Sequence, residues 1–183
     1  MKVNLTNVRL LLKKQDQENN FFFVTFYPLV KINFVKHQRV KTITIPQAVL
    51  TLSNEFFVTI AINDYVSLDK KDILEINEAK HQLVGENPYV VVFIPGMFAS
   101  ISSEARSESA TANVYKNAIA KAIVVTHIGQ RLIGNLFLNF NKPPAPTKLF
   151  KTNKDALLWL EQEIIAFQKI SKQKKLMAST MSS

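Results

Sequence analysis

Apolar positions along residues 43–168 follow two different periods, which indicates a domain that contains both strands and helices. Four runs rich in apolar and β-branched residues predict strands at residues 56–62, 89–94, 118–127 and 147–151. The stretch 43–52, interrupted by Pro46, suits an edge strand that forms a hairpin with residues 56–62. Residues 89–94 (YVVVFI) are continuously apolar, so we expect a central strand buried on both faces.

Capping signals mark the first two helices between these strands. Ser67 precedes Asp69 and Asp72, a pattern typical of a helix start, and Gly85 provides a stop. Serines that can cap a helix predict the start of a second helix within residues 100–117.

The third and fourth helices are predicted from residues 128–140 and from Thr152 onward. Apolar side chains of the third helix share one stripe, which consists of Ile128, Leu132, Ile133, Leu136, Phe137 and Phe140. Thr152 and Asp155 resemble a capping box at the start of the fourth helix. The resulting order β-β-α-β-α-β-α-β-α predicts an α/β fold with a mixed, largely parallel sheet and covering helices.

Composition divides the chain into three sections. Residues 42–168 form the predicted domain, whereas residues 1–41 are an atypical N-terminal extension that contains the apolar run FFFVTFY. This extension could be disordered, could add a strand or hairpin, or could be a non-native stretch translated from AT-rich upstream DNA. Residues 169–183 lack an apolar period, which predicts a basic, flexible tail.

The basic residues lie mainly at the two ends of the chain. The net charge of +9 divides into +6 over residues 1–42, −1 over residues 43–168 and +4 over residues 169–183. A nucleic-acid-binding domain more often carries its cations on the folded body, so we do not expect a nucleic-acid partner.

Rare residue types exclude several kinds of chemistry. The chain has no Cys, three His and four Gly, so thiol catalysis, thiolate-held metals and glycine-rich phosphate loops are not expected. We expect neither a metal nor a cofactor. The apolar run at residues 21–30 is too short to span a bilayer and no signal peptide is evident, so the cytoplasm is the expected location.

Three segments carry a resemblance to a known family: SISSEAR (100–106), AIVVTHIGQRLIGNLFLNFNKPPAPTKLF (122–150) and KDALLWL (154–160). They resemble an uncharacterised bacterial family with a STAS-like fold, the fold of SpoIIAA-like anti-sigma factor antagonists. The resemblance covers residues 43–166 and is most specific between the third helix and Trp159. It implies a regulatory module that binds a protein partner.

The resemblance also implies a candidate switch. Antagonists of this kind are phosphorylated on a serine at the start of the second helix, and Ser100, Ser102 and Ser103 are the counterparts here. That serine usually follows an Asp, whereas none of the three does so in this sequence. An ordinary N-cap role is the alternative for these serines.

Loops that follow parallel strands meet at one edge of a sheet, which places His127 near the serines. Arg131 and two helix starts at this edge suggest an anion site, with a solvent-exposed Arg131 as the alternative. A Ser/His hydrolase is a further alternative, although the chain lacks a G-x-S-x-G elbow.

The apolar stripe of the third helix is a second candidate surface. Leu136, Phe137 and Phe140 could bind a partner, a lipid or a second copy of the chain, or they could simply be core. We therefore expect a non-enzymatic cytoplasmic regulatory or protein-interaction module. A carrier of a small apolar ligand or lipid with a SEC14-like sheet is the alternative.

Overall fold

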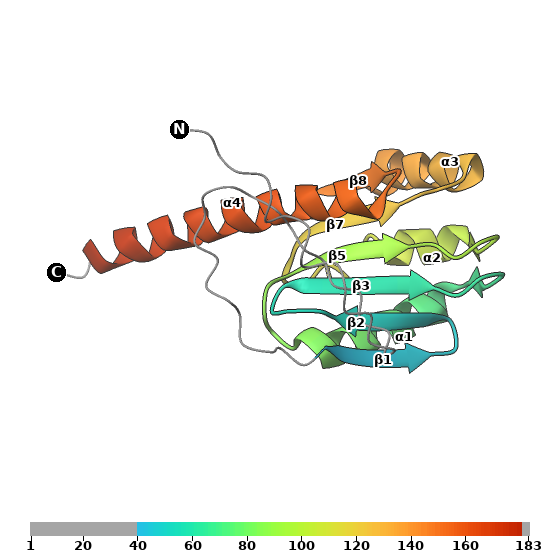
Figure 1. The fold of residues 1–183 in the computed structure, drawn as a ribbon, viewed down its shortest axis with the longest axis horizontal. Coiled ribbons are helices and arrows are strands. Elements are labelled where there is room, and N and C mark those ends of the chain that lie inside the picture. The colour runs from blue at the N-terminus through green and yellow to red at the C-terminus, as the bar shows by residue number, and fades with distance from the viewer. Residues whose placement is uncertain (1–39, 181–183) are drawn as a thin grey trace, which may run out of the picture. The chain divides into compact units, whose positions relative to one another are not determined.

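Residues 40–180 are described by a computed structural model, apart from the side chains of residues 175 and 179. Their main sheet has the order β1-β2-β3-β5-β7-β8 (Figure 1). These strands are β1 Lys41–Ile45, β2 Ala48–Leu52, β3 Phe57–Ile62, β5 Tyr89–Ile94, β7 Ala118–Val124 and β8 Thr147–Phe150. The strands from β3 to β8 pair in parallel and β1 to β3 pair antiparallel, so the predicted mixed, largely parallel sheet is confirmed.

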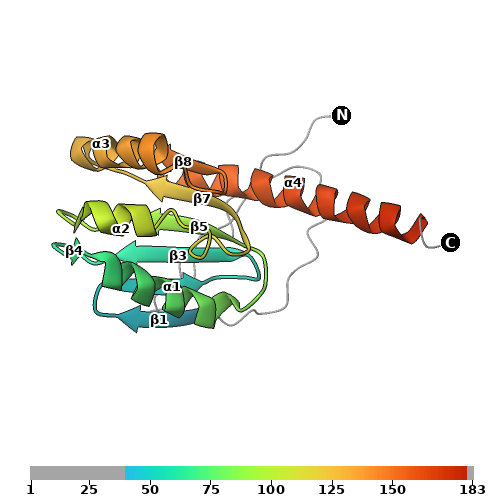
Figure 2. The ribbon, with the colours of Figure 1, turned by 180° about the vertical axis from the view of Figure 1, so that it is seen from behind.

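Helices cover both faces of this sheet. The first face holds α1 (Lys70–Val84) and the short α2 (Ser103–Glu108), which Figure 2 shows in front of the strands. The opposite face holds α4 (Asn153–Thr180), and α3 (Ile128–Leu136) lies beside β8. A two-stranded parallel ribbon pairs β4 (Ser67–Leu68) with β6 (Ser100–Ile101).

The central strand β5 is buried on both faces, as predicted. Tyr89 and Val91 belong to the apolar cluster under α1, whereas Val90 and Val92 belong to the cluster under α4. The alternation follows from the strand period of two. This strand therefore joins the two halves of the core.

The predicted hairpin is wrong in one respect, because residues 41–52 form two strands rather than one edge strand. Pro46 and Gln47 make the turn between β1 and β2, so that Ile45 pairs with Ala48. Proline presets the backbone angle of a tight turn and donates no ladder hydrogen bond, which explains the break.

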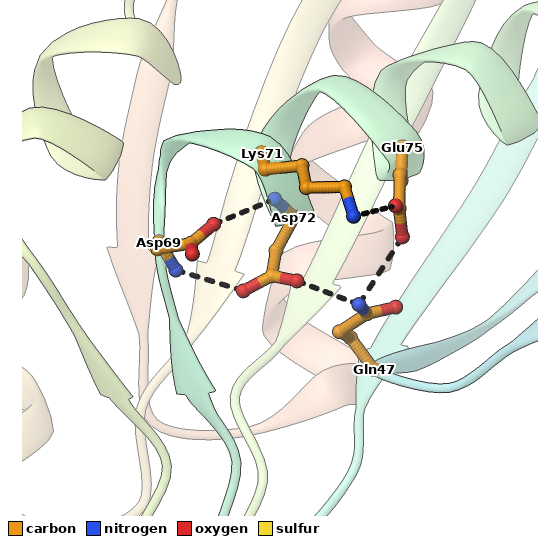
Figure 3. Close-up of polar contacts among 5 residues, drawn as sticks. All are labelled: Gln47, Asp69, Lys71, Asp72 and Glu75. Atoms are coloured by element: carbon orange, nitrogen blue, oxygen red, sulfur yellow. Dashed lines mark hydrogen bonds and ion pairs between the residues drawn. The ribbon is translucent and has the colours of Figure 1, made fainter.

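The start of α1 lies two residues later than predicted. Asp69, rather than Ser67, is the N-cap: its carboxylate accepts the N–H of Asp72 at 3.0 Å, and the Asp72 carboxylate accepts the N–H of Asp69 at 2.8 Å (Figure 3). The amide of Gln47 donates to Asp72 at 2.6 Å and to Glu75 at 3.2 Å, which fastens the β1–β2 turn to the helix. Gly85 ends the helix as predicted.

The second helix is much shorter than residues 100–117. It ends at Glu108, and the Ser109 hydroxyl then donates to the carbonyl of Arg106 at 2.8 Å. Serine, threonine and asparagine side chains compete with the helix for backbone hydrogen bonds, and residues 107–117 are rich in them.

The third helix lies close to its predicted bounds, whereas the fourth extends further than predicted. A π-helical turn, η2 (Phe137–Asn141), continues α3 up to Lys142, whose φ is 44°. The tail expected to be flexible from residue 169 is helical to Thr180 in α4, because Lys, Gln, Leu, Met and Ala propagate a helix that is already packed at its start. Residues 1–39, which include nearly all of the predicted extension, lie outside the described residues.

Candidate functional site

The loops that follow β3, β5 and β7 meet at one edge of the sheet, as the sequence predicted. The N–H of Met97 donates to the carboxylate of Asp64 at 2.6 Å, and the N–H of Tyr65 donates to the carbonyl of Met97 at 2.8 Å. The Gln130 amide donates to the carbonyl of Gly96 at 3.0 Å, which adds the first turn of α3. Local hydrogen bonds therefore hold this edge together.

The three candidate serines have different surroundings at this edge. Ser102 is the N-cap of α2, where its hydroxyl accepts the N–H of Ala105 at 3.1 Å. Ser100 donates to the hydroxyl of Ser67 at 3.0 Å, and Ser103 is exposed on the first turn of the helix. The cap role that the sequence left as an alternative is thus filled by Ser102.

His127 and Arg131 lie at the start of α3, and both are exposed. His127 is the N-cap residue of that helix, but its side chain makes no capping hydrogen bond. Among the described residues, no hydrogen bond joins His127 to any of the candidate serines. The arrangement of a nucleophile next to a base is therefore not formed by these residues.

The apolar stripe of the third helix divides between the interior and the surface. Phe137 is buried with Ile123 and Val125, which is the core position that the sequence left open for this stripe. The helix has more apolar residues than one inward face needs. The exposed members repeat every four residues and form what we name the α3 ridge: Ile128, Leu132, Leu136 and Phe140, with exposed fractions of 90%, 63%, 38% and 77%.

A second exposed apolar group lies in the loops at the same edge. The rings of Tyr65 and Phe98 stack with their centres 5.4 Å apart, and each side chain is 73% exposed. Both residues have positive φ, 61° and 55°, a conformation that is rare for bulky residues and is often found at functional sites. Sequence analysis missed this pair because the two residues are 33 positions apart.

A cavity of about 100 Å³ lies between the sheet and the helices α2 and α3. Its wall is largely apolar and includes Ile62, Ile123 and Ile133. The charged groups that line it are Arg106 and Lys121, and no acidic residue is among its lining residues in the described part of the chain.

Lys121 extends from β7 into a group of aromatic rings. Its ammonium lies 5.1 Å from the ring centre of Phe93, 5.4 Å from that of Tyr115 and 5.5 Å from that of Phe137. Such distances permit cation–π attraction. Burial lowers the pKa of Lys121 to about 8.

Lys80 of α1 lies beside a smaller cavity of about 50 Å³, which shares Lys121 and Phe93 with the first cavity. Its ammonium donates to the Asn77 side chain at 2.6 Å and to the carbonyl of Val114 at 2.5 Å. Burial, and then repulsion from Lys121, lower the pKa of Lys80 to about 7.

Sequence analysis did not single out either lysine. A signal was present for Lys121, because it interrupts the apolar strand AIAKAIV, and lysine is rarely buried without a partner. The signal for Lys80 is weaker, since a lysine on a helix is ordinarily solvated. Only the fold shows that both lysines line the smaller cavity.

The fold and this edge define an α/β domain with exposed apolar groups and a cavity lined by two cationic side chains. Residues 50–164 match a family described as a domain of unknown function (DUF7793), and the chain belongs to that family. A search of curated proteins gave no match. A crystal structure of a protein with unknown function from Arthrobacter sp. FB24 is 22% identical, covers 61% of this chain and 97% of its own, and has a TM-score of 0.21, too low to bear on fold or function.

Two further properties concern only the part of the chain that the structure describes. No helix there is long and apolar enough to cross a membrane. No group of three or more His, Asp or Glu side chains there is placed to hold a metal ion.

Proposed function

We propose that this protein is a non-enzymatic regulatory module of STAS-like type that binds a protein partner. The observation that carries the proposal is two groups of large apolar side chains left exposed, the α3 ridge and the Tyr65–Phe98 pair. Contiguous exposed apolar surface is uncommon on monomeric proteins and often marks an interaction site.

The STAS-like part of the proposal has its own support. The resemblance of residues 100–106 places an antagonist's regulatory serine at the start of α2, and Ser102 caps that helix. A phosphate on the exposed Ser103 would add negative charge close to the surface loops at this edge. Such a change would alter the contact surface without requiring the domain to unfold.

The α3 ridge has the spacing of a helix that contacts another surface through one face. Leu132, Leu136 and Phe140 follow each other at intervals of four residues, so they lie on the same side of the helix. A few large apolar side chains at the centre of an interface commonly supply most of its affinity. We therefore expect the partner to bury this face.

The test removes the ridge without touching the core. Leu132→Ser combined with Phe140→Ser should weaken a partner complex at least tenfold, because both side chains are exposed in the free protein and would be buried in the complex. The matched control is Ile165→Ser combined with Ile170→Ser on α4, since these side chains are 52% and 53% exposed.

The measurement uses the full chain. A protein recovered with it from its native host is purified separately and titrated against the parent and both double variants, and sedimentation velocity reports any self-association. A complex that survives the ridge substitutions unchanged, or that the α4 substitutions weaken equally, would contradict the proposal. If the protein neither binds another protein nor self-associates, the proposal is also contradicted.

A second candidate function is a carrier or sensor of a small apolar ligand. The internal cavity lined by Ile62, Ile123 and Ile133 favours it. No contact among the described residues supports the Ser/His hydrolase alternative, since Ser102 is committed to its helix cap.

A further inference from the structure

The two cavities bring three positively charged side chains together. Lys121 lines both cavities, Arg106 lines the larger one and Lys80 lines the smaller one. Among the described residues that line them, none is acidic. Of these three, Lys80 is buried, whereas Lys121 and Arg106 are half-buried. A cation held in an apolar wall is costly unless an anion, water or hydrogen-bond acceptors compensate it.

The three cations differ in how far the protein compensates them. Lys80 donates hydrogen bonds to Asn77 and to the carbonyl of Val114. Within the described part of the chain, Lys121 has aromatic rings around its ammonium but no hydrogen-bond acceptor and no carboxylate. Of the three cationic groups, the ammonium of Lys121 would therefore interact most favourably with an external anion.

Gln130 cannot supply the missing acceptor, although it lines the same cavity. Its amide nitrogen donates to the carbonyl of Gly96 at 3.0 Å, and its amide oxygen accepts the N–H of Thr126 at 3.2 Å. Both ends of this side chain are thus used in holding the loops. Arg106, by contrast, makes no ion pair with any described residue and is free to act as a second cation.

We propose that the larger cavity binds a small apolar monocarboxylate, with its carboxylate on Lys121 and Arg106 and its hydrocarbon part among the isoleucines of the wall. One negative charge suits this site better than two, because the remaining wall is apolar and a second charge would be desolvated without a partner. The site is distinct from the α3 ridge, whose side chains are exposed on the outside of the domain.

The volume sets the size of the ligand. An apolar cavity of roughly 150 Å³ is known to hold benzene. The present cavity, at about 100 Å³, and its neighbour of about 50 Å³ share Ile73, Phe93, Ser109 and Lys121. A carboxylate that carries a compact chain of about four to six carbons is therefore the class that fits.

The first test uses the parent protein and three probes of similar shape and different charge: hexanoate, hexanamide and hexylamine. Isothermal titration calorimetry at pH 7 should show binding of hexanoate, weaker binding of hexanamide and none of hexylamine. Acetate should bind more weakly than hexanoate, because it lacks the chain that fills the apolar wall. Equal binding of the amine and the carboxylate, or no binding of hexanoate at millimolar concentration, would overturn the proposal.

The second test removes the ammonium. Lys121→Met keeps the length of the side chain and should weaken hexanoate binding roughly 10- to 100-fold, the value of a charge-assisted hydrogen bond. Lys148→Met is the matched control, because Lys148 is exposed on the neighbouring strand β8 and the substitution changes the net charge equally. Equal affinity in the two variants would overturn the proposal, and the probe series on the parent protein decides the question if Lys121→Met does not fold.

Discussion

Two lysines, the buried Lys80 and the half-buried Lys121, depart from ordinary solvation in this protein. Lys80 and Lys121 both lose hydration inside the domain, and their pKa values fall to about 7 and about 8. Their ordinary value in an unfolded chain is near 10.5. Each therefore opposes folding while it is charged, and this penalty depends on pH.

The stability of the protein should rise between pH 7 and pH 9.5. In this window the unfolded chain binds more protons than the folded protein at both lysines, so the free energy of unfolding increases with pH. We stop at pH 9.5 because Tyr89 and Tyr115, whose pKa values burial raises, would reverse the trend above about pH 10. The measurement is denaturant unfolding at the two pH values.

Lys121→Met shows how much of this pH dependence of stability comes from Lys121. The variant should be more stable than the parent at pH 7, and its advantage should shrink by about 1–2 kcal/mol by pH 9.5, because the parent loses its penalty there. Lys148→Met serves as the exposed control and should show no such change. A difference that is the same at both pH values would mean that the pKa of Lys121 is not lowered in the folded protein, and would contradict the prediction.

At the scale of single elements, the capping of α2 allows a direct test of the serine assignments. Ser102→Ala should lower the free energy of unfolding by about 1 kcal/mol, because the N–H of Ala105 loses its acceptor. Ser103→Ala should leave it nearly unchanged, since Ser103 is exposed and outside the cap position. Thermal melts of the two variants, measured side by side, test this prediction. A larger destabilisation by Ser103→Ala than by Ser102→Ala would identify Ser103 as the N-cap.

The elements were predictable from sequence where a local signal decides them. The apolar run of β5 and the Gly85 stop of α1 are such cases, and both lie as predicted. The hairpin and the length of α2 were not predictable, because Pro46 acts as a turn and residues 107–117 bond to their own backbone. In both cases, side chains with special backbone chemistry outweigh the apolar pattern.

The candidate site was predictable only in part. The convergence of the loops follows from parallel strands, and Ser102 was among the residues expected at that edge. The cavity was not predictable, because Arg106, Lys121 and Phe137 come from three separate elements and only their packing encloses a space. Whether the stripe with Leu132 faces a partner or the core stayed open for a related reason: the pattern does not show which side of a helix has a neighbour.

At the scale of the whole molecule, the packing of α4 against the sheet forms the part of the core that lies opposite α1. Trp159 is 8% exposed and its ring centre lies 5.4 Å from that of Phe150. Next to it, Leu160 and Ala156 are fully buried against β5 and β7. The far face of the sheet therefore depends on a small number of side chains from one helix.

Trp159→Ala should destabilise the domain by about 3–5 kcal/mol, because it leaves a cavity between α4 and β8. Trp159→Phe should cost much less, since the indole N–H has no hydrogen-bond partner among the described residues and little polar interaction is lost. Calorimetric unfolding of both variants provides the comparison. A near-neutral Trp159→Ala would place the indole on a binding surface instead of in the core.

The helix α3 and the turn η2 that continues it have different surroundings on their two sides. Ile133, Gly134 and Phe137 face the cavity, whereas Leu132, Leu136 and Phe140 face outward. The inner side of α3 packs closely against β8, because a Cβ at Gly134 would lie 2.8 Å from the side chain of Leu149. Any molecule that shifts this helix from within therefore changes the free energy of contacts made outside, and thermodynamic reciprocity requires that an outer partner change the inner affinity by the same factor.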